Sequence, residues 1–272
     1  MNRILPLKIK APMIYVFTIT LSLMFSVPEA DAQQNERQPA IWRQLIAGSS
    51  TVKSMFVTRS PQFILYSDGF IVFRGDQMDT PYKQVKLTEQ ERVYLVRSLE
   101  SNYRVSGITN SRLKREEPYI QSMQKPVDTN NKNTVVLWLG MHSPPSVHRA
   151  SQTLMKARSG NVELGPAWDL MYQLSQFLST FSHPRSERLK PDEIEIAVQV
   201  LPSYLAEQAS TAKPWPLREV SLKEIRGTRK RAFKSLKGRD AQLAYTFLSE
   251  RSIVSEGNER FEVWVRPILF SE

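Results

Sequence analysis

Residues 61–73 read PQFILYSDGFIVF, two short runs of strand-forming residues on either side of Ser67-Asp68-Gly69. Two such runs separated by a turn that contains Asp-Gly are typical of a β-hairpin, because glycine accepts the positive φ that the turn requires. Directly downstream, residues 82–87 alternate between polar and apolar side chains. This alternation predicts a further strand next to the hairpin.

Three helices are predicted. Thr88-Glu89-Gln90-Glu91 has the pattern of a capping box, whose hydroxyl and carboxylate satisfy the first free amides of a helix. Pro166 suits the first position of the second helix, where its missing N–H is not needed. Apolar residues follow it with helical spacing, at Leu170, Leu174, Phe177, Leu178 and Phe181. The third helix is expected from Asp240, as its N-terminal cap, to about Glu250.

The remaining pattern consists of separate strands and one long polar segment. Residues 134–139 are nearly all apolar and predict a strand buried on both faces, whereas 193–200 alternate as a half-buried strand. The final strand, at 261–267, has proline near its end and is expected at a sheet edge. Polar residues 101–133 are predicted to form a long exposed loop. Strands in hairpins and before helices indicate an α+β fold, with a mixed or mainly antiparallel sheet and about three helices packed on it.

Residues 1–32 have the parts of a secretory signal. Three cations precede an uncharged stretch at 13–27, and the small residues of a cleavage site end at Ala32. We therefore expect an exported protein, periplasmic or extracellular after cleavage near Ala32, with no later transmembrane segment. A retained membrane anchor is the alternative, although the stretch is short for a bilayer span. Residues 33–272 are expected to form one globular body, with a possible division into two subdomains at the polar loop.

Charge is the unusual bulk property of the chain, which has 37 Lys and Arg against 27 Asp and Glu and no cysteine. Without cysteine, an exported protein must be stable through its core alone. Outside the cytoplasm the available polyanions are envelope polymers and anionic lipid headgroups, so no nucleic acid partner is expected. The chain lacks glycine-rich phosphate loops and zinc signatures, and therefore no cofactor and no metal site are predicted.

Residues 226–239 hold the best functional candidate, a run of basic residues with no acid between them. Its members are Arg226, Arg229, Lys230, Arg231, Lys234, Lys237 and Arg239. Like charges this close repel one another, and an anionic partner, either an envelope polymer or a protein, would compensate them. The alternative is a solvated loop. The leading hypothesis is a non-catalytic envelope or secreted module that binds such a partner or an anionic surface.

Two other hypotheses remain open. His142 and His148 lie beside a Pro-Pro turn with Ser143 and Ser146, so they could serve an unrecognised hydrolase in a cleft near the 101–133 loop. No strand–turn–helix elbow surrounds either serine. The alternative is that both histidines are ordinary surface residues and that the chain has no catalytic residue. Alternatively, the final strand at 261–265 could be an exposed edge that pairs with an assembly partner.

Three segments resemble a group of bacterial exported proteins of unknown function. They are the hairpin LYSDGFIVF at 65–73, the helix start KLTEQE at 86–91 and the closing strand VWVRPIL at 263–269. The resemblance implies export and a shared fold. It implies no activity and no site residues.

Overall fold

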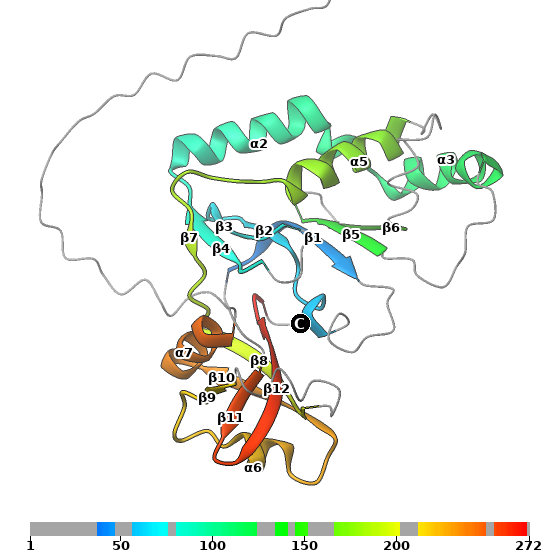
Figure 1. Cartoon of the computed structure of the whole chain (residues 1–272). Coiled ribbons are helices and arrows are strands. Elements are labelled where there is room, and N and C mark those ends of the chain that lie inside the picture. Colours follow the sequence, from blue (N-terminus) through cyan, green and yellow to red (C-terminus); the bar gives the residue numbers. More distant parts are fainter. Residues whose placement is uncertain are drawn as a thin grey trace, which may run out of the picture. The chain divides into compact units, whose positions relative to one another are not determined.

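The computed structural model describes residues 37–46, 56–75, 80–123, 134–140, 145–151, 166–201, 212–248 and 253–270. All of them lie within one unit, Asp31–Glu272. The expected signal at 1–32 and His142 are outside the described residues. The described ranges contain two sheets, five α-helices and one short 3₁₀ helix (Figure 1). The α+β class with mixed and antiparallel sheets is confirmed, and the helices are more numerous than the three predicted.

The first sheet has seven strands in the order β6-β5-β1-β2-β3-β4-β7, and every neighbouring pair is antiparallel. Its strands are β1 (Pro39–Ile46), β2 (Phe63–Tyr66), β3 (Phe70–Phe73), β4 (Lys83–Lys86), β5 (Thr134–Leu139), β6 (Ser146–Ser151) and β7 (Glu187–Arg188). The predicted hairpin is confirmed as β2 and β3. Gly69 has a φ of +82°, and the side chain of Asp68 accepts a hydrogen bond from the amide of Phe70 at 3.0 Å.

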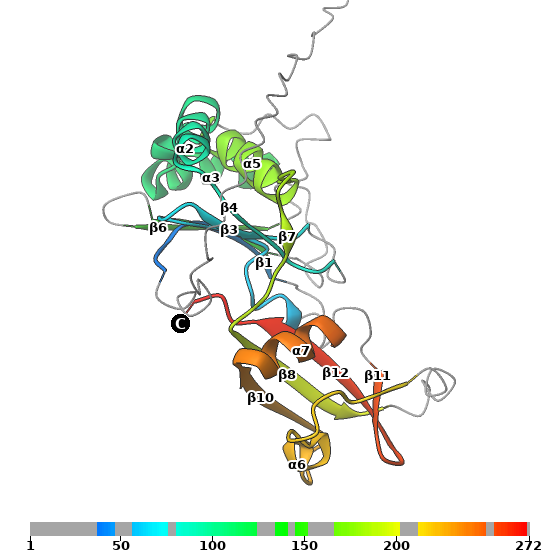
Figure 2. The ribbon, with the colours of Figure 1, turned by 90° about the vertical axis from the view of Figure 1, so that its left-hand side faces the viewer.

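Three helices cover one face of this sheet, as Figures 1 and 2 show from two directions: α2 (Glu89–Tyr103), α3 (Asn110–Met123) and α5 (Pro166–Ser179). The capping box is confirmed at the start of α2. Thr88 Oγ1 accepts a hydrogen bond from the amide of Glu91 at 3.3 Å, and Glu91 Oε2 accepts one from the amide of Thr88 at 2.8 Å. Pro166 is the first residue of α5, as predicted.

The loop predicted over 101–133 is wrong for its first 23 residues, 101–123. They form the end of α2, a 3₁₀ turn (Val105–Gly107) and α3, while 124–133 lie outside the described residues. Helix α3 is fixed by contacts with α5. Trp168 Nε1 donates to the carbonyl of Leu113 at 3.1 Å, and the carboxylate of Glu116 accepts from the amide of Ala167 at 3.0 Å. Tertiary contacts thus order a segment whose polar sequence has no strong local pattern.

The second sheet has five strands in the order β10-β8-β12-β11-β9, all antiparallel except the β9–β11 pair. Its elements are β8 (Glu193–Val200), β9 (Lys213–Pro214), α6 (Leu222–Arg226), β10 (Arg231–Lys237), α7 (Gly238–Leu248), β11 (Ile253–Glu256) and β12 (Glu259–Pro267). The strand at 193–200 is confirmed. The expected edge position of the final strand is wrong, because β12 lies between β8 and β11. Helix α7 begins at Gly238, so that Asp240 lies in its first turn.

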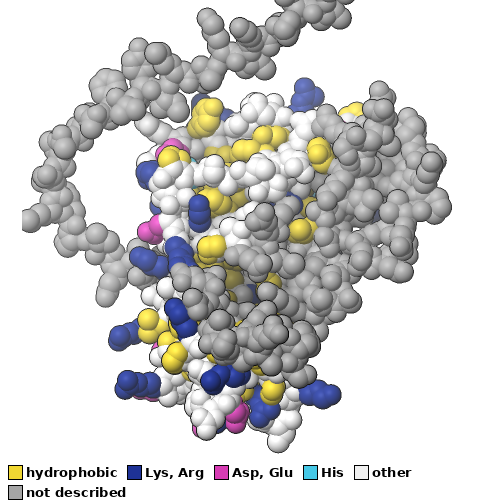
Figure 3. Space-filling view, in the orientation of Figure 1, with side chains coloured by type: hydrophobic (Ala, Val, Ile, Leu, Met, Phe, Trp, Pro, Cys, Tyr) yellow, Lys and Arg dark blue, Asp and Glu magenta, His cyan; other side chains and the backbone are white. Residues whose placement is uncertain are grey.

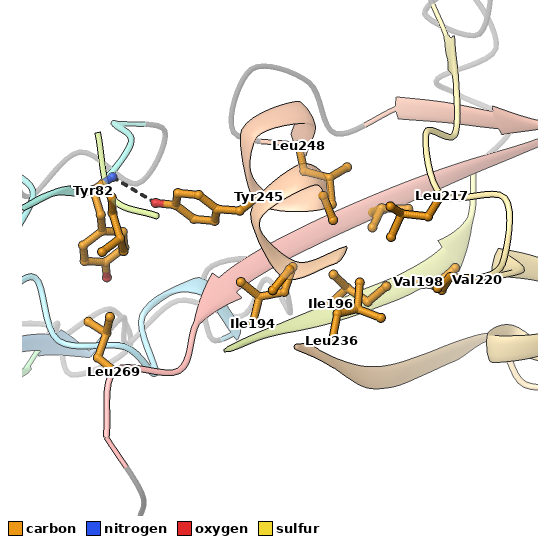
Figure 4. Packing of buried hydrophobic residues seen from close by; sticks show 14 of the residues in the cluster. Tyr82, Ile194, Ile196, Val198, Leu217, Val220, Leu236, Tyr245, Leu248 and Leu269 are labelled. Atoms are coloured by element: carbon orange, nitrogen blue, oxygen red, sulfur yellow. Dashed lines mark hydrogen bonds between the residues drawn. The ribbon is translucent and has the colours of Figure 1, made fainter. Parts of the chain in front are cut away.

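A hydrophobic cluster joins α7 to the second sheet and to the face of the first sheet opposite its helices. Figure 4 shows Tyr245 and Leu248 of α7 above Ile194 and Ile196 of β8, and the hydroxyl of Tyr245 accepting a hydrogen bond from the amide of Tyr82 at 3.1 Å. The chain passes from the first sheet to the second between β7 and β8, which differs from the division considered at 101–133. No helix among the described residues is long and apolar enough to cross a membrane.

Candidate anion-binding edge

The candidate basic residues gather around β10, which is the first strand in the order of the second sheet and pairs only with β8 among the described strands. In Figure 2, β10 is the outermost strand of this sheet beside β8. The chain enters it through the turn after α6 and leaves it at Gly238, whose φ of +55° turns the strand directly into α7. An L-residue side chain is strained in that backbone conformation, so glycine is favoured at this sharp change.

Two of the seven predicted site residues, Arg231 and Lys237, contact other side chains of the second sheet, and a third is partly buried. Arg231 donates from Nε and Nη2 to Gln199 Oε1 at 3.2 and 2.8 Å, and its guanidinium carbon lies 5.3 Å from the ring centre of Trp264. Lys237 Nζ lies 3.4 Å from Glu193 Oε2. Arg226 is half-buried at the end of α6. The contacts of Arg231 connect β10 to β8 and β12, whereas the side chain of Lys237 remains 75% exposed.

The other four predicted site residues are exposed: Arg229 and Lys230 before the strand, Lys234 within it and Arg239 after it. Among the described residues, no carboxylate forms an ion pair with any of these four. In the view of Figure 3, Lys and Arg side chains project from several sides of the lower part, where the second sheet lies. We call these four residues, together with Lys237, the basic edge.

The basic edge presents its charges on both faces of β10 and at both of its ends. Alternate residues of a strand point to opposite faces, so Lys234 lies on the face of Ala232 and Leu236, and Lys237 lies on the other. Phe233 shares the face of Lys237 and is 49% exposed, with its ring centre 5.6 Å from that of Phe56. Sequence reasoning missed Phe233, whose only signal is a large apolar residue within a basic run.

Of the two candidate histidines only His148 lies among the described residues, and it is placed differently from expectation. His148, predicted at the surface, is 1% exposed on β6, and its Nε2 lies 3.0 Å from Ser146 Oγ. This distance suits a serine–histidine pair, but the two residues are two positions apart on one strand and the ring is closed to solvent. A general base must lie within hydrogen-bond reach of the reacting group, and this buried imidazole is not accessible to a substrate. The contact fits a packed histidine better than a catalytic one.

His183 belongs to a second feature, an apolar pocket of about 380 Å³ beside the start of α2. The pocket is lined by Leu87, Gln90, Glu91, Tyr94, Leu95, Phe181 and His183. His183 Nε2 lies 3.5 Å from Glu91 Oε1, and Arg185 forms an ion pair with the same carboxylate. The hydrogen bond from the amide of Thr88, then its hydroxyl and the charges of Arg185 and His183, lower the pKa of Glu91.

The lowered pKa of Glu91 predicts a loss of stability in acid. Because the folded state favours the carboxylate, its contribution is complete above the unfolded pKa of about 4.3 and disappears as the pH falls through the lower folded value. We expect Glu91→Gln to flatten the decline in unfolding free energy below about pH 4.5, measured by urea unfolding from pH 3 to 6. Glu219→Gln, an exposed control, should keep the wild-type slope. Identical slopes for the two variants would contradict this role of Glu91.

No cofactor site emerges from the described residues. Within them, no group of three or more His, Asp or Glu side chains is arranged to hold a metal ion. The described residues include a charged strand edge and an apolar pocket. Comparisons of the chain with protein-family models, with curated proteins and with solved structures find no match.

Proposed function

We propose that this protein is an exported, non-catalytic module that binds an anionic partner or surface through the basic edge. The observation that carries the proposal is the set of four exposed cations around β10 that have no ion-pair partner among the described residues. A surface arginine or lysine is ordinary by itself. Four around one seven-residue strand make a local positive field that attracts anions.

Electrostatics determines how such a surface behaves. Exposed charges at the edge of a protein repel one another weakly in water, and a bound anion converts this repulsion into attraction. Near an anionic membrane surface each lysine or arginine contributes about 1 kcal/mol. Salt screens these interactions over about 8 Å at physiological ionic strength, so binding through the basic edge should fall as salt rises.

Export is the second part of the proposal. Its support is the pattern of residues 1–32, where cations, an uncharged apolar stretch and an Ala-x-Ala site follow one another. An exported basic protein meets envelope polymers, lipid headgroups and acidic proteins. All of these are anionic, and the basic edge is suited to each of them by charge alone.

The test is retention of the purified protein on anionic envelope fractions across a salt series. The basic-edge variant replaces Arg229, Lys230, Lys234 and Arg239 by Gln. The control variant replaces the same number of exposed arginines and lysines in the first sheet and its helices, namely Lys83, Arg97, Lys114 and Arg115. We expect wild type and control to be retained at low salt and released at high salt. The basic-edge variant should bind at least about tenfold more weakly.

The matched pair of variants separates local charge from total charge. Both lose four positive charges, so equal weakening of the two would mean that net charge alone drives retention. Wild-type retention of the basic-edge variant would overturn the proposal, because the four cations would then contribute nothing. If the basic-edge variant is released from the envelope fractions while the control variant is retained, the result supports the basic edge as the contact.

A further inference from the structure

We infer that β10 binds an extended acidic segment of a partner protein as an additional strand of the second sheet. This inference rests on the proposed function and narrows it, since it names the class of partner and the way it binds. It combines the free backbone of the edge with its charge and with one exposed aromatic ring.

The backbone of β10 provides the first part of the argument. Its seven residues pair with β8 in one unbroken antiparallel register, from Arg231 opposite Gln199 to Lys237 opposite Glu193. In an antiparallel pair every second residue turns its N–H and C=O away from the partner strand. Among the described residues, no hydrogen bond reaches the outward backbone groups of β10, and no other strand lies beyond it. Such an edge is a template on which another chain can pair.

β10 also lacks several structural features that block edge pairing in other sheets. Prolines, bulges and very short strands commonly protect an edge. Strand β7, at one end of the first sheet, has only two residues, and β9, at the other end of the second sheet, also has two, one of them Pro214. β10 has no proline and no register shift. Its backbone can therefore accept several consecutive residues of an added strand.

Charge selects the occupant. Lysines on an edge strand prevent pairing with a second copy, because an added β10 would bring the same cations together. Lys234 attracts a strand that carries carboxylates on the face of Lys234, whereas the opposite face, which holds Phe233, suits the apolar side chains of the same strand. Cross-strand pairs of opposite charge stabilise a sheet, and like charges destabilise it. The acidic partner therefore fits the edge that a second copy does not.

Phe233 distinguishes an edge strand that binds a partner from one whose charges only prevent pairing with other chains. Protection requires charge alone, whereas Phe233 exposes half of a large ring at the middle of β10. An apolar side chain of an added strand, opposite or diagonal to this ring, would cover it. Lipid headgroups and polyanions have neither the backbone N–H and C=O groups nor the apolar side chain that this edge can accommodate. A peptide segment has both.

The probe is a fluorescent nine-residue peptide in which Glu alternates with Val or Thr, compared with the same peptide carrying N-methyl groups on its four central amides. The two peptides have equal charge, but methylation removes hydrogen-bond donors from both edges of the added strand. We expect the unmodified peptide to bind the purified protein at least about tenfold more tightly, because several backbone hydrogen bonds are lost in the other. Fluorescence anisotropy measures both affinities.

Two protein variants locate the binding. Lys234→Glu should weaken binding of the unmodified peptide about tenfold. Lys83→Glu reverses the charge of an exposed lysine in β4 of the first sheet and should leave the affinity for the peptide unchanged. Hydrogen exchange provides an independent readout. Peptide binding should slow the hydrogen exchange of the backbone amides of residues 231–237 and leave the exchange of the β6 amides unchanged.

The outcomes separate this inference from the proposed function. Equal binding of the two peptides would overturn strand addition, and salt-dependent retention lost only in the basic-edge variant would still support the proposed function. Retention on phosphatidylglycerol vesicles without binding of either peptide would overturn the peptide class in favour of a lipid surface. If the basic-edge variant kept both its peptide binding and its retention on envelope fractions, both proposals would be overturned.

Discussion

Phe261→Ala is expected to lower the free energy of unfolding by about 3–5 kcal/mol, the range for removing a buried aromatic side chain. Phe261 is fully buried in β12 and lies between Val200 of β8 and Val254 of β11. Truncation leaves a cavity between three strands, and neighbouring chains that are held by backbone hydrogen bonds on both sides cannot close it fully. A loss of this size is a large part of the stability of a typical domain.

Urea unfolding followed by circular dichroism measures this loss, and Phe233→Ala is the matched control in the same sheet. Phe233 is 49% exposed, so its truncation should cost less than about 1 kcal/mol. The two variants remove the same atoms, and only the environment of the ring differs. Similar losses for both would contradict the placement of β12 inside the sheet and of β10 at its edge.

The same comparison shows what the sequence can predict. Local signals in the sequence predict the hairpin and the start of α2, because an Asp-Gly turn and a capping box are each complete within a few residues. Phe233 and Phe261 both lie in runs compatible with strands, and nothing near either residue says which strand has neighbours on both sides. Edge position depends on pairings between distant segments. Proline near its end therefore predicts an edge position for the final strand, whereas β10 is the strand that lies there.

Strand β1 illustrates a second limit. Its inward-facing positions are Ile41, Arg43 and Leu45, and the middle one breaks the apolar alternation that identifies a strand. Arg43 is 2% exposed, and its Nε donates a hydrogen bond to Ser175 Oγ of α5 at 2.9 Å. A buried arginine is tolerated only with such partners. Because its partner is 132 positions away, the sequence near β1 does not reveal it.

The candidate site was predictable in composition and not in geometry. The basic run at 226–239 is visible in the sequence, and all seven of its candidate residues fall on β10 or its immediate flanks. The contacts of Arg231 and Lys237 depend on Gln199, Glu193 and Trp264, which come from β8 and β12. The solvated-loop alternative missed that half of the run, residues 231–237, is a strand. The sheet provides this information, because only pairing with β8 fixes the faces on which the charges lie.

Trp168→Ala is expected to release α3 from α5 and to cost about 3–5 kcal/mol of unfolding free energy. Trp168 is 6% exposed and packs in the cluster between α5 and the first sheet, and its indole N–H donates to the carbonyl of Leu113 in α3. Its removal leaves a cavity and abolishes this hydrogen bond between α5 and α3. The segment from 101 to 123, whose sequence predicted a loop, should then lose its attachment.

Limited trypsin digestion tests this release directly, because α3 carries Arg112, Lys114 and Arg115. Proteases cleave a helix slowly while it is docked and faster once it opens, so cleavage after these residues, identified by mass spectrometry, should accelerate in Trp168→Ala. Tyr94→Ala removes an aromatic ring that is 77% exposed on α2 and should leave both stability and cleavage unchanged. Equally rapid cleavage of the wild-type protein at these three residues would show that α3 is not held by Trp168, and the segment would then behave as the loop that its sequence predicts.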